Sequence, residues 1–477
     1  ATGLVLTLTD AQASGQYIQG AGAVNLSTTA LTQNLDVTHI ANALQVGGNA
    51  SGTLDVGTYA LTINAGQIGT LALSGAGSVF VQNLAGDSNL ANVTAATVTA
   101  SVSSDVDISG NSNLTSVDTY AINAGQTLTV LTSQTASDVA LSGSGTVRFS
   151  NSGTFTGTWA STVSAEVAAG QTLTISATLA SGHTIQGDAA AVDGTGGSVV
   201  ITGLDNAVYN LANVHAGARD AGLAAGTVTA SLTADTHLAH TTVLGDVALS
   251  IDANHLLTMT AAQAVARSIT GAGSVTLDAA AVATQYDFST VDAMGTLTVE
   301  YSAVGTVHGS TVFTDVDVVH LAGGGATTMT AAQANGLSFA GSTAGASVVI
   351  TGSDGVQTLV GTSGSDIIAT GAGLDAVDIS QGGSDKLVFD GNTNDMDITG
   401  FTVASLVSGG DILDFSALAS SLSGTGVKLL STTDSDLSMG AKVIVLEDVV
   451  GSAEAIATQF AQYGNVVAGG ILNSNIN

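Results

Sequence analysis

The chain contains no cysteine and no proline among its 477 residues, and only six lysines and arginines stand against 37 aspartates and glutamates. Without cysteine there is no disulfide framework, thiolate metal site or cysteine nucleophile. Six cations cannot neutralise a phosphate backbone, which argues against nucleic acid as a partner. The net charge of −31 also disfavours docking on an anionic membrane surface.

Long apolar runs are missing too. Apolar residues make up 45% of the chain, which excludes a disordered acidic tail, but Thr, Ser, Gly and Asn interrupt them everywhere. A membrane-spanning helix needs about 18 consecutive apolar residues, so no membrane insertion is predicted. The first ten residues have neither a positive region nor an apolar core, so a classical signal peptide is absent or was removed.

The acids that are present are 33 aspartates and only four glutamates. Glutamate is the better helix former and would be used freely on helical surfaces. Aspartate is at home in turns, where it bonds its own backbone, and in calcium loops. The imbalance therefore predicts a turn-rich β protein in which calcium sites are possible.

Short runs of Val, Ile, Leu and Thr alternate with Gly-rich turns from residue 4 to about residue 350, as in Ser198-Val-Val-Ile-Thr202. Such runs, rich in β-branched residues and bounded by glycine, predict strands. A degenerate repeat joins a strand to a polar turn, as in Leu257-Thr-Met-Thr-Ala-Ala-Gln263, and its copies begin 45 to 84 residues apart. A propeller would hold a tighter period, whereas an irregular β-solenoid or stacked β-modules tolerate this drift. We favour an elongated, irregular β-solenoid, because tandem sandwiches usually carry proline in linkers and edge strands.

A change of composition near residue 352 divides the chain. All three arginines precede it, all three lysines follow it, and thirteen aspartates fall between Asp354 and Asp448. We expect residues 1–351 to be a repetitive β-rich structural region of two or more modules, and residues 352–477 to be a distinct C-terminal region. Its tail, from Ser452 to Tyr463, has the apolar spacing of an amphipathic helix.

The C-terminal region opens with three Gly-x-Asp turns, at Gly364-Ser-Asp366, Gly373-Leu-Asp375 and Gly383-Ser-Asp385, each followed two residues later by an aliphatic side chain. Such a turn points a carboxylate into a loop, and the aliphatic residue on the next short strand points inward. If the turns stack, carboxylates of adjacent loops can share one hard cation, and calcium suits such a site. With Asp378 and Asp390 added, we expect the carboxylates to crowd one ladder, where a cation would relieve their repulsion. The alternative is an array of aspartate turns that simply face water.

These turns resemble the RTX family of calcium-binding repeats, a β-roll with the pattern G-G-x-G-x-D-x-U-x, where U is a large aliphatic residue. The resemblance covers about residues 358–390 and extends loosely to Asp397–Phe401 and Asp411–Phe415. Thr362 and Thr370 depart from it, because each replaces a glycine. The resemblance implies Ca²⁺ as the cofactor and export through a type I route by a Gram-negative bacterium. Together, the resemblance and the expected ladder give these candidate metal-binding residues: Gly364, Asp366, Gly373, Asp375, Asp378, Gly383, Asp385 and Asp390.

Other motifs carry little chemistry. His237-x-x-His240 is the only close histidine pair, and residues three apart on a strand point to opposite faces, although a loop could bring them together. The Gly-x-Gly copies, such as Gly143-Ser-Gly and Gly271-Ala-Gly, lack the lysine and helix of a phosphate loop and predict turns. A glycan-degrading groove would need aromatic and cationic side chains, but Trp159 is the single tryptophan. We therefore expect no enzymatic activity.

The combination is similar to calcium-dependent bacterial surface-layer proteins. It predicts an extracellular structural protein, on the cell surface or in a biofilm matrix, that assembles with itself into a layer or fibre. Cell-surface polysaccharide is a further partner that this class admits. The alternative is a secreted RTX-type adhesin or matrix-binding protein, for which Phe149, Phe155 and Trp159 form the best aromatic stretch; the simpler interpretation makes them core residues of strands.

Overall fold

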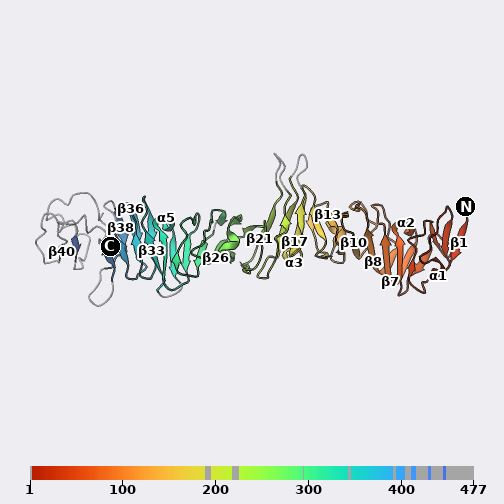
Figure 1. Cartoon of the computed structure of the whole chain (residues 1–477), viewed down its shortest axis with the longest axis horizontal. Helices are drawn as coiled ribbons and strands as arrows, with labels where there is room; N and C mark the ends of the chain where they lie inside the picture. Colours follow the sequence, from red (N-terminus) through yellow and green to blue (C-terminus); the bar gives the residue numbers. More distant parts are fainter. Residues whose placement is uncertain are drawn as a thin grey trace. The chain divides into compact units, whose positions relative to one another are not determined.

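The structure is a computed structural model that describes residues 3–188, 195–217, 225–293, 295–341, 345–389, 394–402 and 410–414, together with the backbone of 428–430 and 444–446. The chain forms a parallel β-solenoid of about 18 turns (Figure 1). The predicted all-β solenoid is thus confirmed. The chain divides into two compact units, residues 1–231 with 241–249 and residues 232–240 with 250–477.

In many coils, strands that are neighbours along the chain enter different sheets, although β6, β7 and β8 follow one another within one sheet. In the first unit β10, β12 and β15 join one sheet, while β11, β13 and β16 join another. A parallel pair needs a crossover connection, and here the strand of the other sheet lies within it. Side chains alternate along each strand, so Leu128 and Val147, which are partners on β11 and β13, both point inward and are fully buried. The core is therefore a stack of aliphatic columns.

The strands up to residue 232 are β1 (Val5–Leu8), β2 (Ala23–Leu26), β3 (Leu35–Asp36), β4 (Leu44–Val46), β5 (Thr53–Asp55), β6 (Ala60–Asn64), β7 (Ala72–Gln82), β8 (Val93–Val102), β9 (Val106–Asp107), β10 (Thr119–Ile122), β11 (Thr127–Val130), β12 (Ala140–Gly143), β13 (Thr146–Phe149), β14 (Gly153–Thr154), β15 (Thr158–Trp159), β16 (Ser164–Val167), β17 (Thr172–Ser176), β18 (Ile185–Gly187), β19 (Ser198–Thr202), β20 (Val214–His215) and β21 (Val228–Leu232). The later strands are β22 (Thr236–His237), β23 (Ala248–Ile251), β24 (Leu256–Thr260), β25 (Ile269–Gly271), β26 (Ser274–Ala280), β27 (Val291–Ala293), β28 (Leu297–Tyr301), β29 (Gly305–Thr306), β30 (Val318–Leu321), β31 (Ala326–Thr330), β32 (Ser338–Gly341), β33 (Ser347–Thr351), β34 (Thr358–Val360), β35 (Ile367–Ala369), β36 (Gly373–Asp378), β37 (Lys386–Val388), β38 (Asn394–Thr399), β39 (Ile412–Asp414), β40 (Lys428–Leu430) and β41 (Ile444–Leu446).

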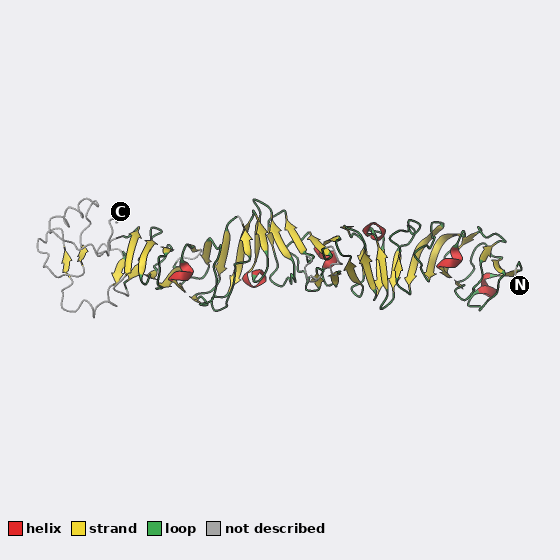
Figure 2. Ribbon diagram, turned by 90° about the horizontal axis from the view of Figure 1, so that it is seen from above, coloured by secondary structure: helices red, strands yellow, loops and turns green. Residues whose placement is uncertain are grey.

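In the part of the chain that the structure describes, helices are confined to single turns beside the strands (Figure 2). They are α1 (Asp10–Ala13), α2 (Ala65–Ile68), α3 (Ala177–Ala180), α4 (Ala261–Ala264), α5 (Ala331–Ala334) and the 3₁₀ turn η1 (Thr132–Thr135). The repeat that predicts a strand and a polar turn is here a strand followed by a capped helical corner. In α4, Thr260 Oγ1 accepts a hydrogen bond from the Gln263 amide (3.1 Å), and Gln263 Oε1 accepts one from the Thr260 amide (2.9 Å).

Replacing Thr260 by alanine is expected to lower the free energy of unfolding of this coil by about 1 kcal/mol, because the amide of Gln263 loses its capping oxygen. Hydrogen exchange of the α4 amides measures the change. Thr260→Ser keeps the hydroxyl and is expected to preserve protection. Equal loss of protection in both variants would show that the cap is not the source of the stability.

Glycines of the expected turns adopt positive φ, and two of the three expected core aromatics are buried. Gly143 and Gly271 have φ of +96° and +113°, a backbone region that only glycine adopts freely. Phe149 and Phe155 are buried and in ring contact, with centroids 5.6 Å apart. Trp159 is partly exposed, stacks on His183 at 4.5 Å and donates its Nε1 hydrogen to the Leu179 carbonyl (2.9 Å). The simpler interpretation of the phenylalanines, as core residues, is confirmed.

The sheets continue across the change of composition near residue 352, since β33 pairs with β35 through Val349 and Ile367. The expected helix from Ser452 to Tyr463 and the candidate ligand Asp390 lie outside the described residues. Among the residues that are described, every helix is too short or too polar to cross a bilayer.

Candidate metal centre

Three aspartates form a row in successive coils of the second unit. Asp366, Asp385 and Asp411 each stand immediately before a strand, namely β35, β37 and β39, and these strands pair in register through Ile367, Lys386 and Ile412. The three side chains therefore occupy the same place in consecutive turns. All three residues are buried, with exposed fractions of 1%, 0% and 9%.

Each carboxylate of this aspartate row accepts a backbone hydrogen bond from the preceding coil. Asp366 Oδ1 accepts the Val348 amide at 2.7 Å, Asp385 Oδ1 accepts the Asp366 amide at 2.8 Å, and Asp411 Oδ1 accepts the Asp385 amide at 2.8 Å. Thr362, which departs from the glycine pattern, adds its amide (2.6 Å) and its hydroxyl (2.8 Å) as donors to Asp366. The row thus satisfies backbone donors that would otherwise be buried without partners.

Burial makes the ionised row costly. Burial, together with the charges of Asp366 and Asp411, raises the pKa of Asp385 to about 6, and burial also raises the pKa of Asp366. Asp385 Oδ2 is buried and has no hydrogen-bond partner within the described part of the chain. This oxygen is the atom of the row that is free to hold a proton or a cation.

Asp375 lies in the other sheet of the same coils, on β36 between its neighbours β34 and β38. It is fully buried, and its Oδ1 accepts the Gln357 amide at 2.8 Å. Asp375 Oδ2 and Gln357 Oε1 are buried without hydrogen-bond partners among the described residues. Asp378 is partly exposed and accepts the Ser380 amide (2.9 Å) in a local turn. The expectation that these carboxylates crowd one ladder was wrong: Asp366 and Asp385 share a row, and Asp375 stands apart.

The three candidate glycines allow the coils to approach closely. A Cβ at Gly383 would overlap the carbonyl oxygen of Gly364, and a Cβ at Gly364 would overlap that of Ala346. At Gly373 it would overlap the carbonyl oxygen of Gly355. Stacking therefore requires glycine at each position, while the role of their carbonyls as metal ligands stays a prediction.

The donor set fits a hard cation. Within the residues described, the buried polar atoms without a partner around Asp385 and around Asp375 are all oxygens. They are Oδ2 of Asp385, Oδ2 of Asp375 and Oε1 of Gln357. Calcium takes six to eight oxygen ligands with flexible geometry. Asp375 and Asp385, which lie in different sheets, would each contribute to a separate calcium site, whereas Asp366 already accepts three hydrogen bonds.

Sequence reasoning missed Asp411 as a member of the row. It follows Asp385 by 26 residues, whereas Asp385 follows Asp366 by 19. Because this connection is longer, the sequence spacing did not indicate that Asp411 occupies the same position in its coil as Asp385. The signal was present, because Gly409 precedes Asp411 by two positions and Leu413 follows it by two, and the other members of the row have the same spacing.

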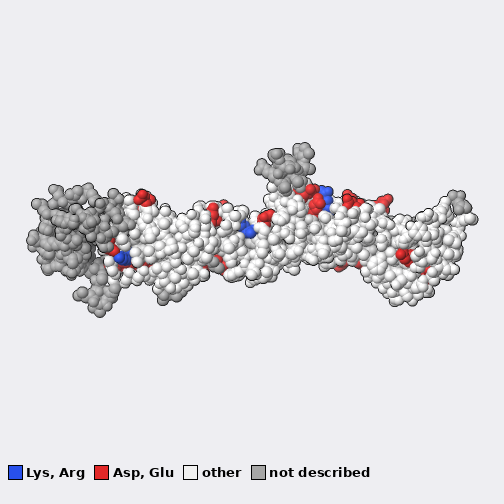
Figure 3. Space-filling model, viewed as in Figure 1, with Lys and Arg blue, Asp and Glu red and all other residues white. Residues whose placement is uncertain are grey.

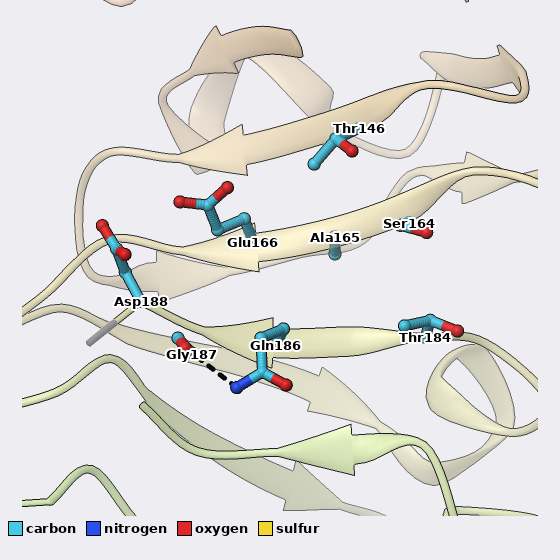
Figure 4. A pocket seen from close by; sticks show the side chains of 8 residues that line it. All are labelled: Thr146, Ser164, Ala165, Glu166, Thr184, Gln186, Gly187 and Asp188. Atoms are coloured by element: carbon cyan, nitrogen blue, oxygen red, sulfur yellow. Dashed lines mark hydrogen bonds between the residues drawn. The ribbon is translucent and has the colours of Figure 1, made fainter. Parts of the chain in front are cut away.

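A shallow hollow of about 460 Å³ lies on the outer face of the first unit, over β13, β16 and β18 (Figure 4). Its lining includes the polar side chains of Glu166, Gln186 and Asp188. Arg148 contacts both acids, with its Nε 3.2 Å from Glu166 and a terminal nitrogen 2.6 Å from Asp188. These pairs neutralise one of the two negative charges and leave a hydrogen-bonding surface without an aromatic platform among the lining residues.

Comparison of the chain with protein-family models, with curated proteins and with solved structures finds no match. What can be said of its class therefore comes from its own geometry. That geometry, a parallel β-solenoid, is consistent with the β-roll architecture of RTX repeats.

Proposed function

We propose that the protein is an extracellular structural protein of a Gram-negative bacterium that assembles with itself into a calcium-dependent layer or fibre. The observation that carries the proposal is the free, buried Oδ2 of Asp385 in a row of three aspartates. A buried carboxylate without a partner is costly, and a bound cation removes that cost. Calcium would therefore order the C-terminal coils.

The charge of the chain supports self-assembly that depends on cations. The net charge of −31 keeps monomers apart until cations are present, although most of the face seen in Figure 3 is uncharged.

Electron microscopy of the purified full chain tests the proposal. We expect dispersed particles in EGTA and ordered sheets or filaments at about millimolar calcium, the affinity range of extracellular calcium modules. The double variant Asp375→Asn, Asp385→Asn is expected to stay dispersed in both conditions. The matched control Asp378→Asn, which alters an aspartate outside the buried sites, is expected to assemble normally. Dispersed wild-type particles in both conditions would contradict the proposal.

A second candidate function, an adhesin that binds a cell-surface polysaccharide, is favoured by the hollow over β13, β16 and β18, whose carboxylates and amide can bond sugar hydroxyls. The burial of Phe149 and Phe155 counts against it, because sugar rings are usually held by exposed aromatic faces. A chain that stays monomeric with calcium and binds cell-wall glycan would favour this function over assembly.

A further inference from the structure

Two histidines converge at a corner of the second unit. Strand β22 ends at His237, the next residue, Leu238, is fully buried, and the chain then turns, so that His237 and His240 both face solvent. Their rings are stacked, with centroids 6.1 Å apart and planes inclined by 17°. Of the two alternatives for this pair, a continuous strand and a loop, the structure has the loop, because β22 ends at His237.

A carboxylate from another coil completes the group. Asp278 lies on β26, which pairs with β24, and β24 pairs with β22. Its Oδ2 is 3.1 Å from Nε2 of His240. One nitrogen of each histidine and one oxygen of Asp278 all lie within 4.8 Å of one another, and this is the one such group of three within the described residues. Asp278 Oδ1 is buried and has no hydrogen-bond partner in the described part of the chain.

The corner is held in place from the intervening coil. Gln263 Nε2 donates to the carbonyl of Ala239 at 3.0 Å, which fixes the turn between the two histidines. The Oε1 of the same side chain accepts the Thr260 amide, and Thr260 is the register partner of Asp278. The capping residues of α4 therefore position both sides of the group before any ligand arrives.

Two imidazoles and one carboxylate are the ligand set of borderline transition metals, not of calcium. At zinc–ligand distances of about 2.0–2.1 Å, tetrahedral ligand atoms lie roughly 3.3 Å apart. The widest separation in the group therefore has to close by at most about 1.5 Å. We propose that His237, His240 and Asp278 bind one Zn²⁺-class ion, with water in the fourth position. The ion would join the β22 corner to β26 across β24 and so clamp three successive coils.

Calorimetric titration of the metal-free full chain with Zn²⁺, at constant excess calcium, tests this site separately from the acidic sites. One equivalent is expected to bind. Loss of even a residue that only orients a ligand costs about 10–100-fold in metal affinity, so His240→Gln and Asp278→Asn are each expected to weaken binding at least tenfold. The matched control is His255→Gln, because His255 also contacts an aspartate, Asp235 at 3.4 Å, but belongs to no group of three among the described residues.

Co²⁺ in place of Zn²⁺ supplies a second readout, since a tetrahedral nitrogen and oxygen site gives visible absorption bands that both site variants should lose. Zinc binding that is absent, or that falls equally in His255→Gln, would overturn the site. Zinc uptake that requires two chains per ion would overturn the clamp within one chain. None of these results depends on calcium-driven assembly, which the Asp375 and Asp385 variants test.

Discussion

Replacing Gly383 by alanine is expected to unfold the coils around the aspartate row, whereas the same change at the adjacent Gly382 is expected to leave them folded. Both glycines have positive φ, +129° and +92°, so each substitution carries a backbone strain of about 1–2 kcal/mol. Only at Gly383 would the new Cβ also overlap the carbonyl oxygen of Gly364 and lie 3.0 Å from Asp385 Oδ1. At Gly382 no atom lies within 4 Å of that position. Overpacking adds about 1–3 kcal/mol for Gly383→Ala alone.

Hydrogen exchange measured by mass spectrometry separates the two variants. Protection of residues 358–389 should collapse in Gly383→Ala and fall only slightly in Gly382→Ala. Coils of the first unit, such as those with β11 and β13, should keep their protection, because a solenoid coil contacts only its neighbours. Similar protection in both variants would show that the coils can move apart to accept a Cβ at Gly383. The stability of these coils would then not depend on their close approach at Gly383.

The fold could be predicted from the sequence because its signals are local. Short β-branched runs with glycine turns give strands, and side-chain alternation gives the buried columns that contain Leu128 and Val147. The corner helices were predicted only as polar turns. A single helical turn, such as Ala261–Ala264, is too short to show a 3.6-residue period, and its capping box forms only when Gln263 turns back on Thr260.

The candidate metal centre could be predicted only in part. The number of residues in each coil decides which sheet an aspartate enters, and this number varies along the chain. The Gly-x-Asp turns identify Asp366, Asp375 and Asp385, yet Asp375 belongs to the other sheet. Nothing in the local sequence distinguishes it, since the same Gly-x-Asp motif occurs in both sheets, although Gly373–Asp375 lies within β36. The role of Thr362 was equally hidden: it breaks the glycine pattern, but its hydroxyl is a hydrogen-bond donor to Asp366.

In the absence of calcium, the coils around Asp385 are expected to lose stability as the pH rises from about 4 to about 7. Burial raises the pKa of Asp385 from 3.8 to about 6. Between these two values the folded state holds a proton that the unfolded state has released, so the free energy of unfolding falls with rising pH. The full loss is about 3 kcal/mol for Asp385, and the raised pKa of Asp366 acts in the same direction. Protection factors of residues 358–389, corrected for intrinsic exchange at each pH, measure it.

Calcium is expected to reverse this loss, since the cation binds the ionised carboxylates and competes with the proton. At pH 7 added calcium should restore protection, and at pH 4 it should change little. Asp385→Asn is neutral at every pH and should make the profile shallower and weaken the calcium response, whereas Asp378→Asn should behave like the wild type. A flat profile in the wild type would mean that the row is ionised without cost, and the case for a cation at Asp385 would lose its physical basis. A steep profile without a calcium response would instead make the proton the natural occupant of the row, and assembly would then follow acidification rather than calcium.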